Sequence, residues 1–286
     1  MKQLIVTSDD FGLSTGVNSA VEQAWQSGIL TVASLIPAGN AFDGAVAIAL
    51  KHPALQIGLH LTLVQGRSVL THEEIPGLVD NSCNFSDNPV IAGMRYFFNR
   101  NLYSQLRNEI KAQIERILDT GIQLTHIDGH LNIHLHPTVF AILLELMPHY
   151  GISTLRLSQE RLSCNLRLDK SRIIGKLLEK LIFDILTGSA RPRLNHHKIG
   201  YAAEVKGVYS SGRMTEDYIL KAIDSLMDGV SEFYFHPGIL PDKEILQRMP
   251  GYLHEKELAA ITSSDVIKKI NSLRIQLVNY RGELKC

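Results

Sequence analysis

A cluster of histidines constrains this chain more than any other feature of its sequence. Four of its twelve histidines and one aspartate lie within the eleven residues from His126 to His136. Any one of them alone would be interpreted as a solvated side chain in a polar loop. Together they indicate a chemical site, because histidine is the commonest metal ligand and the side chain that titrates nearest neutral pH.

The spacing of the cluster adds a structural constraint. His126, Asp128 and His130 are two residues apart, so on an extended segment their side chains point to the same side. The preceding residues from Leu124 read as a strand, and Pro137 begins a helical pattern. The cluster therefore lies where a strand leads into a helix, at the carboxyl end of the predicted sheet, where active sites gather in α/β folds.

The rest of the chain alternates short apolar runs with helical patterns. This alternation predicts an α/β fold with about seven mostly parallel strands. No repeat or linker interrupts it, so we expect one domain over residues 1–286. Strands are expected near residues 4–7, 31–36, 56–61, 124–127, 153–157, 203–207, 231–236 and 274–279. Helices are expected near residues 14–28, 42–50, 102–118, 137–147, 169–186 and 216–227, and around residues 255 and 266.

Residues 64–101 break this rhythm with a dense series of Gly, Pro, Asn and Asp residues and a run of aromatic side chains. A segment of this length in a compact domain is usually a lid or a binding surface. A satellite cluster that covers one end of the fold is an equally good interpretation. Residues 187–200, which include Pro192, are expected to form a loop.

Composition excludes several classes of protein. Twenty-nine basic and twenty-nine acidic residues balance, which argues against a nucleic-acid partner. Cys83, Cys164 and Cys286 are too far apart to indicate a zinc site or a disulfide framework. The N-terminal apolar run is a strand rather than a signal peptide, and no stretch reaches the length of a membrane span. We therefore expect a cytoplasmic protein without an integral membrane segment.

Residues 173–186 come closest to a membrane span, but charged residues divide them. The pattern predicts an amphipathic helix that packs on the core, with contact to a membrane surface as the less favoured alternative.

Carboxylates and imidazoles recur where the predicted strands end. They are Asp9 and Asp10 after the first strand, His60 on the third, the histidine cluster on the fourth and His236 near the last. Parallel strands bring these ends to one edge of the sheet. One carboxylate with two or more imidazoles suits Zn²⁺ or another divalent ion, with a position left open for water.

A divalent ion lowers the pKa of a bound water and so generates a nucleophile without a serine or cysteine. The adjacency of Asp9 and Asp10 lets one carboxylate bind the metal while the other acts as a base, and His236 is placed to protonate a leaving group. The pattern predicts metal-assisted hydrolysis.

Four motifs then point to a family. They are Ser8–Gly12, Gly58–Leu61, Thr125–His130 and His236–Gly238. In this order and spacing they strongly resemble the YdjC-like carbohydrate deacetylases, which are similar in fold to the polysaccharide deacetylases. The resemblance covers residues 2–280.

The resemblance implies an irregular (β/α) barrel of the glycoside hydrolase/deacetylase type that hydrolyses an N-acetyl amide on an amino sugar. It implies Mg²⁺ or Zn²⁺ held by Asp10, His60 and His126, with Asp9 as the base and His236 as the acid. The residues assigned to substrate binding are His130, His134, Asp128 and Arg156. Support of a histidine is an equally good role for Asp128.

Residues 58–80 and 92–98 look most like the hopanoid-biosynthesis-associated branch, which implies an N-acetylglucosaminyl hopanoid lipid as substrate. The resemblance also implies a homodimer. Many relatives carry histidine where this chain has Asn132, so we assign Asn132 to a sugar hydroxyl rather than to the metal.

Two other functions fit parts of the sequence. His134 and His136 resemble the paired histidines of metal-dependent amidohydrolases, although those enzymes carry the pair on their first strand. A sugar-binding module without catalysis is compatible with the same fold. Asp9 favours catalysis, since a pure metal binder would not need it.

Overall fold

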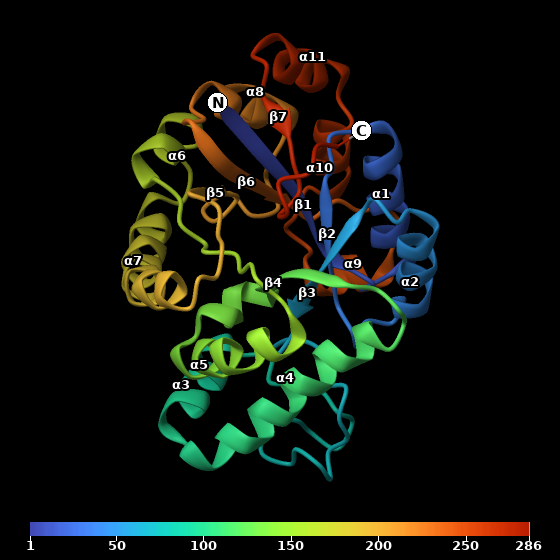
Figure 1. Cartoon of the computed structure of the whole chain (residues 1–286), viewed down its shortest axis with the longest axis vertical. Helices are drawn as coiled ribbons and strands as arrows, with labels where there is room; N and C mark the ends of the chain where they lie inside the picture. The colour runs from blue at the N-terminus through green and yellow to red at the C-terminus, as the bar shows by residue number, and fades with distance from the viewer. Residues whose placement is uncertain (286) are drawn as a thin grey trace.

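The computed structural model describes residues 1–285 and contains a seven-stranded sheet (Figure 1). The strand order is β4-β3-β2-β1-β6-β5, and β7 pairs with the first residues of β1. Every strand pair is parallel, and the sheet curls into a half-barrel, which confirms the predicted α/β fold of the (β/α) barrel type. The strands are β1 (Lys2–Phe11), β2 (Val32–Leu35), β3 (Gln56–Leu61), β4 (Leu124–Gly129), β5 (Glu204–Lys206), β6 (Gly229–Phe235) and β7 (Gln276–Leu277).

Helices surround the sheet (Figure 1). The first begins after Ser14, whose hydroxyl accepts a hydrogen bond from the Val17 amide, as its position in the sequence predicts. The α-helices are α1 (Thr15–Ser27), α2 (Phe42–Lys51), α3 (Pro89–Phe98), α4 (Tyr103–Leu118), α5 (Pro137–Leu146), α6 (Leu162–Leu168), α7 (Ile173–His196), α8 (Glu216–Asp224), α9 (Lys243–Arg248), α10 (His254–Ile261) and α11 (Ser264–Ser272). Short 3₁₀ helices are η1 (Arg100–Leu102), η2 (His130–Leu135) and η3 (Met147–Tyr150).

Strand β1 lies in the middle of the sheet, between β2 and β6. Leu4, Val6 and Phe11 are fully buried in the main core. A strand covered on both faces needs a continuous apolar run, which explains the sequence Leu4-Ile5-Val6. The polar residues at the far end of β1, Asp9 and Asp10, are therefore held by a buried central strand of the sheet.

Residues 64–101 are part of the main core rather than a satellite cluster. Ile75, Leu78, Phe85 and Tyr96 are buried and belong to the same hydrophobic cluster as the strands. Within this segment, helix α3 packs against α5. The turn-forming residues thus connect short, well-anchored pieces instead of a free loop.

A buried carboxylate on α4 anchors the start of this segment. Both oxygens of Glu109 accept backbone hydrogen bonds, from Val69 at 2.9 Å and from Leu70 at 3.0 Å. The side chain of Gln113, one turn later, accepts a hydrogen bond from the Thr62 amide and donates to the Thr62 carbonyl. It also donates to the Glu109 carboxylate. Burial raises the pKa of the Glu109 carboxyl to about 7, although these hydrogen bonds oppose the shift.

The prediction of a strand at residues 153–157 is wrong, because the structure has only isolated bridges there. The segment does lie between β4 and β5, and Leu155 bridges Ile127 while Thr154 bridges Gly200. Its pairing with β4 ends after this single bridge. The chain turns in the next residues, where the Gln159 amide donates a hydrogen bond to the Leu157 carbonyl. The segment nevertheless fills the gap between the two strands.

The loop expected at residues 187–200 is also wrong, since α7 continues to His196. Pro192 lies inside this helix, where it removes one backbone hydrogen bond. Ala190 and Leu194, four residues apart on one face, are fully buried. Their burial outweighs the cost of the proline.

The first turns of α7 depart from expectation as well, because most apolar side chains of residues 173–186 face outward instead of packing on the core.

None of the helices within residues 1–285 combines the length and the apolar character that a membrane-spanning segment needs. Cys83 and Cys164 are free thiols, and Cys286 lies outside the described residues.

Glu109→Ala should lower the free energy of unfolding by about 2 kcal/mol, because two amides of the 64–101 segment lose their acceptor. Urea denaturation would measure the change. The control is Lys111→Ala on the exposed face of the same helix, which should stay within about 0.5 kcal/mol of wild type. Equal effects of the two substitutions would show that Glu109 is not an anchor.

Candidate functional site

Three strand ends build the site at the carboxyl edge of the sheet. The register between β1 and β2 is irregular between Ser8 and Phe11, and Asp10 has a left-handed backbone with φ of 62°. Such a bulge re-aims side chains, and aspartate tolerates the left-handed conformation better than most residues. His60 lies near the end of β3, and His130 is the first residue after β4.

Asp10, His60 and His130 come together at this edge. Their ligand atoms all lie within 4.8 Å of one another. The Oδ1 atom of Asp10 is 3.3 Å from His60 Nε2 and 3.2 Å from His130 Nδ1. The other oxygen, Oδ2, is buried without a hydrogen-bond partner among the described residues. A buried carboxylate oxygen of this kind needs a partner, and a divalent cation bound to these three residues would supply one.

The charges of the site also fit a cation. Burial raises the pKa of Asp10, but hydrogen bonds from His130 and His60 outweigh it and hold the pKa well below its usual range. His60 donates from Nδ1 to Asp128 at 2.7 Å. Burial lowers the pKa of His60, yet the charge of Asp128 and hydrogen bonds to both carboxylates raise it to about 10. A cation bound at Nε2 would replace the proton there, and Asp128 would still fix the ring orientation.

His126, which the sequence placed in the ligand set, lies apart from this group. Its Nδ1 is 2.9 Å from the Thr125 hydroxyl, its Nε2 is 3.1 Å from the Ser34 hydroxyl, and its ring stacks on Tyr280. Burial lowers the pKa of His126 to about 3. A Cβ atom on Gly58 would lie 2.3 Å from this ring, so the strand beneath it must carry glycine. Among the described residues, His126 belongs to neither group that could hold a metal.

Arg156 is the buried hub of the site. Its Nη1 and Nη2 donate to the two oxygens of Asp9, each at 2.7 Å, its Nη2 also lies 2.8 Å from Asp128, and its Nε donates to Glu232 at 2.8 Å. The ring of Tyr234 covers the guanidinium at 4.6 Å. Burial lowers the pKa of Arg156, but the charges of Asp128, Asp9 and Glu232 raise it well above its usual range. Arg156 is 1% exposed, so it orients Asp9 rather than contacting a ligand.

Asp9, His60 and Asp128 form a second group that could hold a metal. In this group the carboxylate oxygens are already used. Both oxygens of Asp9 accept from Arg156, and those of Asp128 accept from His60, Ser34 and Arg156. Of the three carboxylates in these two groups, only Asp10 retains a buried oxygen without a partner among the described residues, which favours the group of Asp10, His60 and His130.

His236 faces Asp9 across the site, with 4.0 Å between Nε2 and Asp9 Oδ2. Burial lowers its pKa, although the charges of Asp10 and Asp9 oppose the shift. Glu257 accepts the backbone amides of His236 at 2.6 Å and Met214 at 2.8 Å, and burial raises the pKa of Glu257 to about 7. Glu257 thus fixes the backbone at His236, and Nε2 of the imidazole lies toward Asp9.

His134 and His136 do not form a metal-binding pair. His134 is fully buried, with Nε2 2.9 Å from the Arg156 carbonyl, and burial lowers its pKa to about 4. His136 Nε2 lies 3.0 Å from the Gly93 carbonyl. These contacts tie η2 and α3 to their neighbours. Like Arg156 and Asp128, His134 is covered by protein, so of the four predicted substrate contacts only His130 faces open space.

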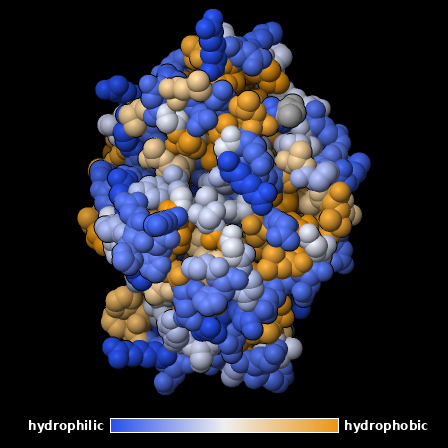
Figure 2. Space-filling view, viewed as in Figure 1, coloured by the Kyte–Doolittle hydropathy of each residue, from blue (hydrophilic) through white to orange (hydrophobic). Residues whose placement is uncertain are grey.

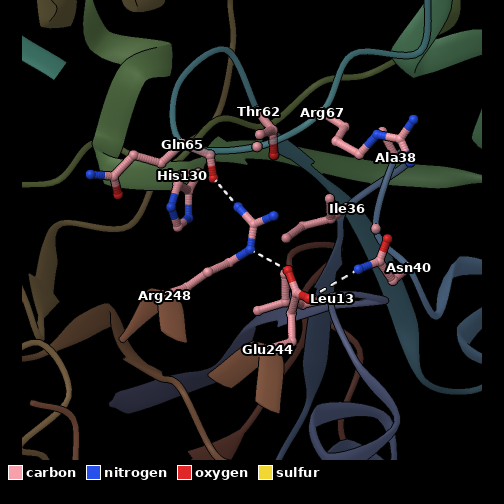
Figure 3. Close-up of a pocket in the computed structure, with 12 residues that line it drawn as sticks. Leu13, Ile36, Ala38, Asn40, Thr62, Gln65, Arg67, His130, Glu244 and Arg248 are labelled. Carbon is pink, nitrogen blue, oxygen red and sulfur yellow. Dashed lines mark hydrogen bonds and ion pairs between the residues drawn. The ribbon is translucent and has the colours of Figure 1, made fainter. Parts of the chain in front are cut away.

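The site opens into a cleft of about 470 Å³, within the size range of small-molecule sites. Asp9, His60, His130 and His236 line it, together with Asn132. A narrow recess behind His130 contains Arg248, which reaches between the Gln65 carbonyl and Glu244 (Figure 3). Arg248 therefore joins α9 to the 64–101 segment and closes one wall beside His130.

Sequence reasoning missed several polar residues of the site. Ser34, Glu257 and Tyr280 carry no motif and act only through contacts formed in the fold. Glu232 did give a signal, because a single acidic residue within the apolar β6 run needs a buried partner. The residues that donate hydrogen bonds to Glu232 are Arg156, Thr7 and Tyr280.

Known proteins resemble the chain over nearly its whole length. A carbohydrate deacetylase of Brevibacillus brevis is 26% identical over 97% of this chain and 98% of its own, and one of Geobacillus stearothermophilus is 28% identical over 97% and 96%. A chitooligosaccharide deacetylase of Salmonella typhi is 28% identical over 84% of this chain and 98% of its own. A crystal structure from Enterococcus faecalis V583, titled as a candidate cellobiose-phosphate cleavage protein, has a TM-score of 0.76, 26% identity and 98% coverage of both chains. Residues 3–272 match the family described as YdjC-like protein, and the chain belongs to that family.

Proposed function

We propose that this protein is a metal-dependent carbohydrate deacetylase that removes the N-acetyl group from an amino sugar. The observation that carries the proposal is a second carboxylate, Asp9, that lines the same cleft as His60 and His130, the two histidines grouped with Asp10. Relatives named carbohydrate deacetylase and chitooligosaccharide deacetylase supply the substrate class.

In this proposal Asp10, His60 and His130 hold a divalent ion, Zn²⁺ or Mg²⁺, and His126 is a structural residue. The bound ion would polarise the acetyl carbonyl and lower the pKa of the attacking water. Asp128 keeps the His60 ring in place through the 2.7 Å hydrogen bond to Nδ1.

Asp9 acts as the base and accepts a proton from the attacking water while a C–O bond forms at the acetyl carbon. Arg156 holds both oxygens of Asp9, so the carboxylate cannot rotate away. His236 takes up that proton at Nε2 and gives it to the amide nitrogen as the C–N bond breaks, which releases acetate and a free amine and returns Asp9 and His236 to their starting states. The 4.0 Å between Asp9 and His236 is too long for a hydrogen bond and leaves room for reacting groups between them.

The finer substrate assignment is an N-acetylglucosaminyl hopanoid lipid, a proposal that rests on the resemblance of residues 58–80 and 92–98. Exposed apolar side chains at Val90, Met94 and Phe98 suit a lipid-linked sugar. A cytoplasmic location and a homodimer stay part of this proposal.

The alternative of an amidohydrolase loses support, because His134 and His136 bond to backbone carbonyls away from Asp9.

Acetate release from a substrate panel tests the function. The panel contains N-acetylglucosamine, chitobiose and an N-acetylglucosaminyl hopanoid, each with metal-stripped and metal-restored protein. We expect metal-dependent release from at least one amino sugar. Release from the lipid alone would support the hopanoid assignment, and release from chitobiose would remove it. No release from any member by metal-loaded protein would favour a sugar-binding module.

Asp9→Asn should lower turnover by about 10²- to 10⁴-fold while the metal content stays unchanged, because an amide cannot accept the proton. Acetate release and elemental analysis of the purified variant would measure both quantities. Asp43→Asn on the exposed surface of α2 is the matched control and should keep full activity. Wild-type turnover in Asp9→Asn would exclude Asp9 as the base.

His130→Ala should lower the metal content and the rate together, whereas folded His126→Ala should keep its metal. The reason is that His130 lies beside Asp10, while both ring nitrogens of His126 contact hydroxyls. Elemental analysis gives the stoichiometry, and thermal melting shows whether each variant is folded. Metal loss in folded His126→Ala, with full occupancy in His130→Ala, would restore the ligand set expected from the sequence.

A further inference from the structure

The outer face of α7 is an unusually apolar surface for a helix exposed to solvent. Ile174 is 78% exposed, and Leu178 and Ile182, one and two turns later, are 60% and 56% exposed. Buried side chains on the opposite face, including Thr187, Ala190 and Leu194, attach the helix to the protein. The exposed apolar residues of this face are Ile173, Ile174, Leu177, Leu178, Leu181, Ile182 and Ile185.

A second apolar face lies on the same side of the molecule. Helix α3 exposes Val90, Ile91, Met94, Phe97 and Phe98. Both α3 and α7 pack against α5. Figure 1 places the two helices at the left edge, and Figure 2, in the same orientation, shows apolar side chains along that edge. Contiguous exposed apolar surface of this kind marks an interaction site.

Positive charge accompanies both faces. Residues 161–198, which include α6 and α7, contain nine basic and three acidic residues, although the whole chain has no net charge. Residues 89–102 contain Arg95 and Arg100 and no acidic residue. No described carboxylate forms an ion pair with Arg167 or Lys170 beside the start of α7. The rest of the chain therefore carries the acidic excess.

Helix α7 borders the cleft. Arg172, at the start of the helix, lines the cleft together with Glu179 and Phe183. A surface that holds α7 would thus lie at the mouth of the cleft, within reach of Asp9 and His60 at its base.

We infer that α7 and α3 form a docking surface for an anionic lipid bilayer. The apolar side chains enter the boundary between headgroups and acyl chains, and the basic residues around them contact anionic headgroups. A second copy of the chain is a poorer occupant, because pairing two such faces would bring two basic segments together. The inference goes beyond the proposed function and does not depend on it, since docking needs neither a metal nor turnover.

Co-sedimentation with vesicles tests the docking surface. Wild-type protein should sediment with vesicles of phosphatidylcholine and phosphatidylglycerol, and much less with phosphatidylcholine alone. The triple variant Ile174→Gln, Leu178→Gln, Ile182→Gln removes one row of the α7 face and should abolish sedimentation. The double variant Leu50→Gln, Leu273→Gln changes exposed apolar residues elsewhere and should bind as wild type does.

A charge variant separates electrostatic from apolar contact. Arg167→Gln with Lys170→Gln should weaken partitioning onto the anionic vesicles by roughly an order of magnitude. Acetate release from a water-soluble substrate should be unchanged in every variant, so loss of docking and loss of catalysis are distinguishable.

Two outcomes would overturn the inference. One is wild-type protein that fails to sediment with the anionic vesicles. The other is a folded triple variant that binds them as tightly as wild type. If wild type fails to bind vesicles and light scattering shows a dimer that the triple variant lacks, the face belongs to a second copy of the chain instead.

Discussion

The guanidinium of Arg156 holds together the charges on which the site depends. Asp9 comes from β1, Asp128 from β4 and Glu232 from β6, and all three carboxylates are buried around this one cation. Removing one member of such a buried network costs about 3–5 kcal/mol, because the charges that remain lose their partner. Arg156 therefore stabilises the meeting point of three strands and fixes Asp9, the proposed base, in the same set of contacts.

The network also explains why the two neighbouring aspartates have different roles. Arg156 holds Asp9 through both carboxylate oxygens, so the orientation of Asp9 is fixed. Asp10, turned aside by the bulge in β1, meets two imidazoles and keeps one oxygen without a partner among the described residues. One bulged residue thus separates Asp9, the carboxylate proposed for proton transfer, from Asp10, the carboxylate proposed to bind the metal.

The sequence predicted the parts of the site that depend on where strands end. Asp10, His60 and the histidine cluster follow apolar runs, and parallel strands bring such positions together. The choice between His126 and His130 could not be predicted, because β4 ends at Gly129 and η2 turns His130 back toward the mouth of the site. Arg156 was found as a site residue, but its role depends on three carboxylates distant in sequence. Local sequence preference predicts that α7 ends before Pro192. The helix continues because Ala190 and Leu194 are buried against the core.

Net charge was the least informative property of the sequence, because it averages over regions with opposite excess. A balance of basic and acidic residues argues against binding to phosphates only if the two signs are mixed over the surface. Here the segment of α6 and α7 is strongly basic, and the carboxylates of the site form their ion pairs with Arg156 and His60 within the interior. The buried carboxylates thus have their partners inside the protein, while basic residues beside the apolar face of α7, such as Arg167 and Lys170, remain at the surface. The same segregation of charge that permits a carboxylate-rich site therefore leaves a cationic, apolar surface next to its opening.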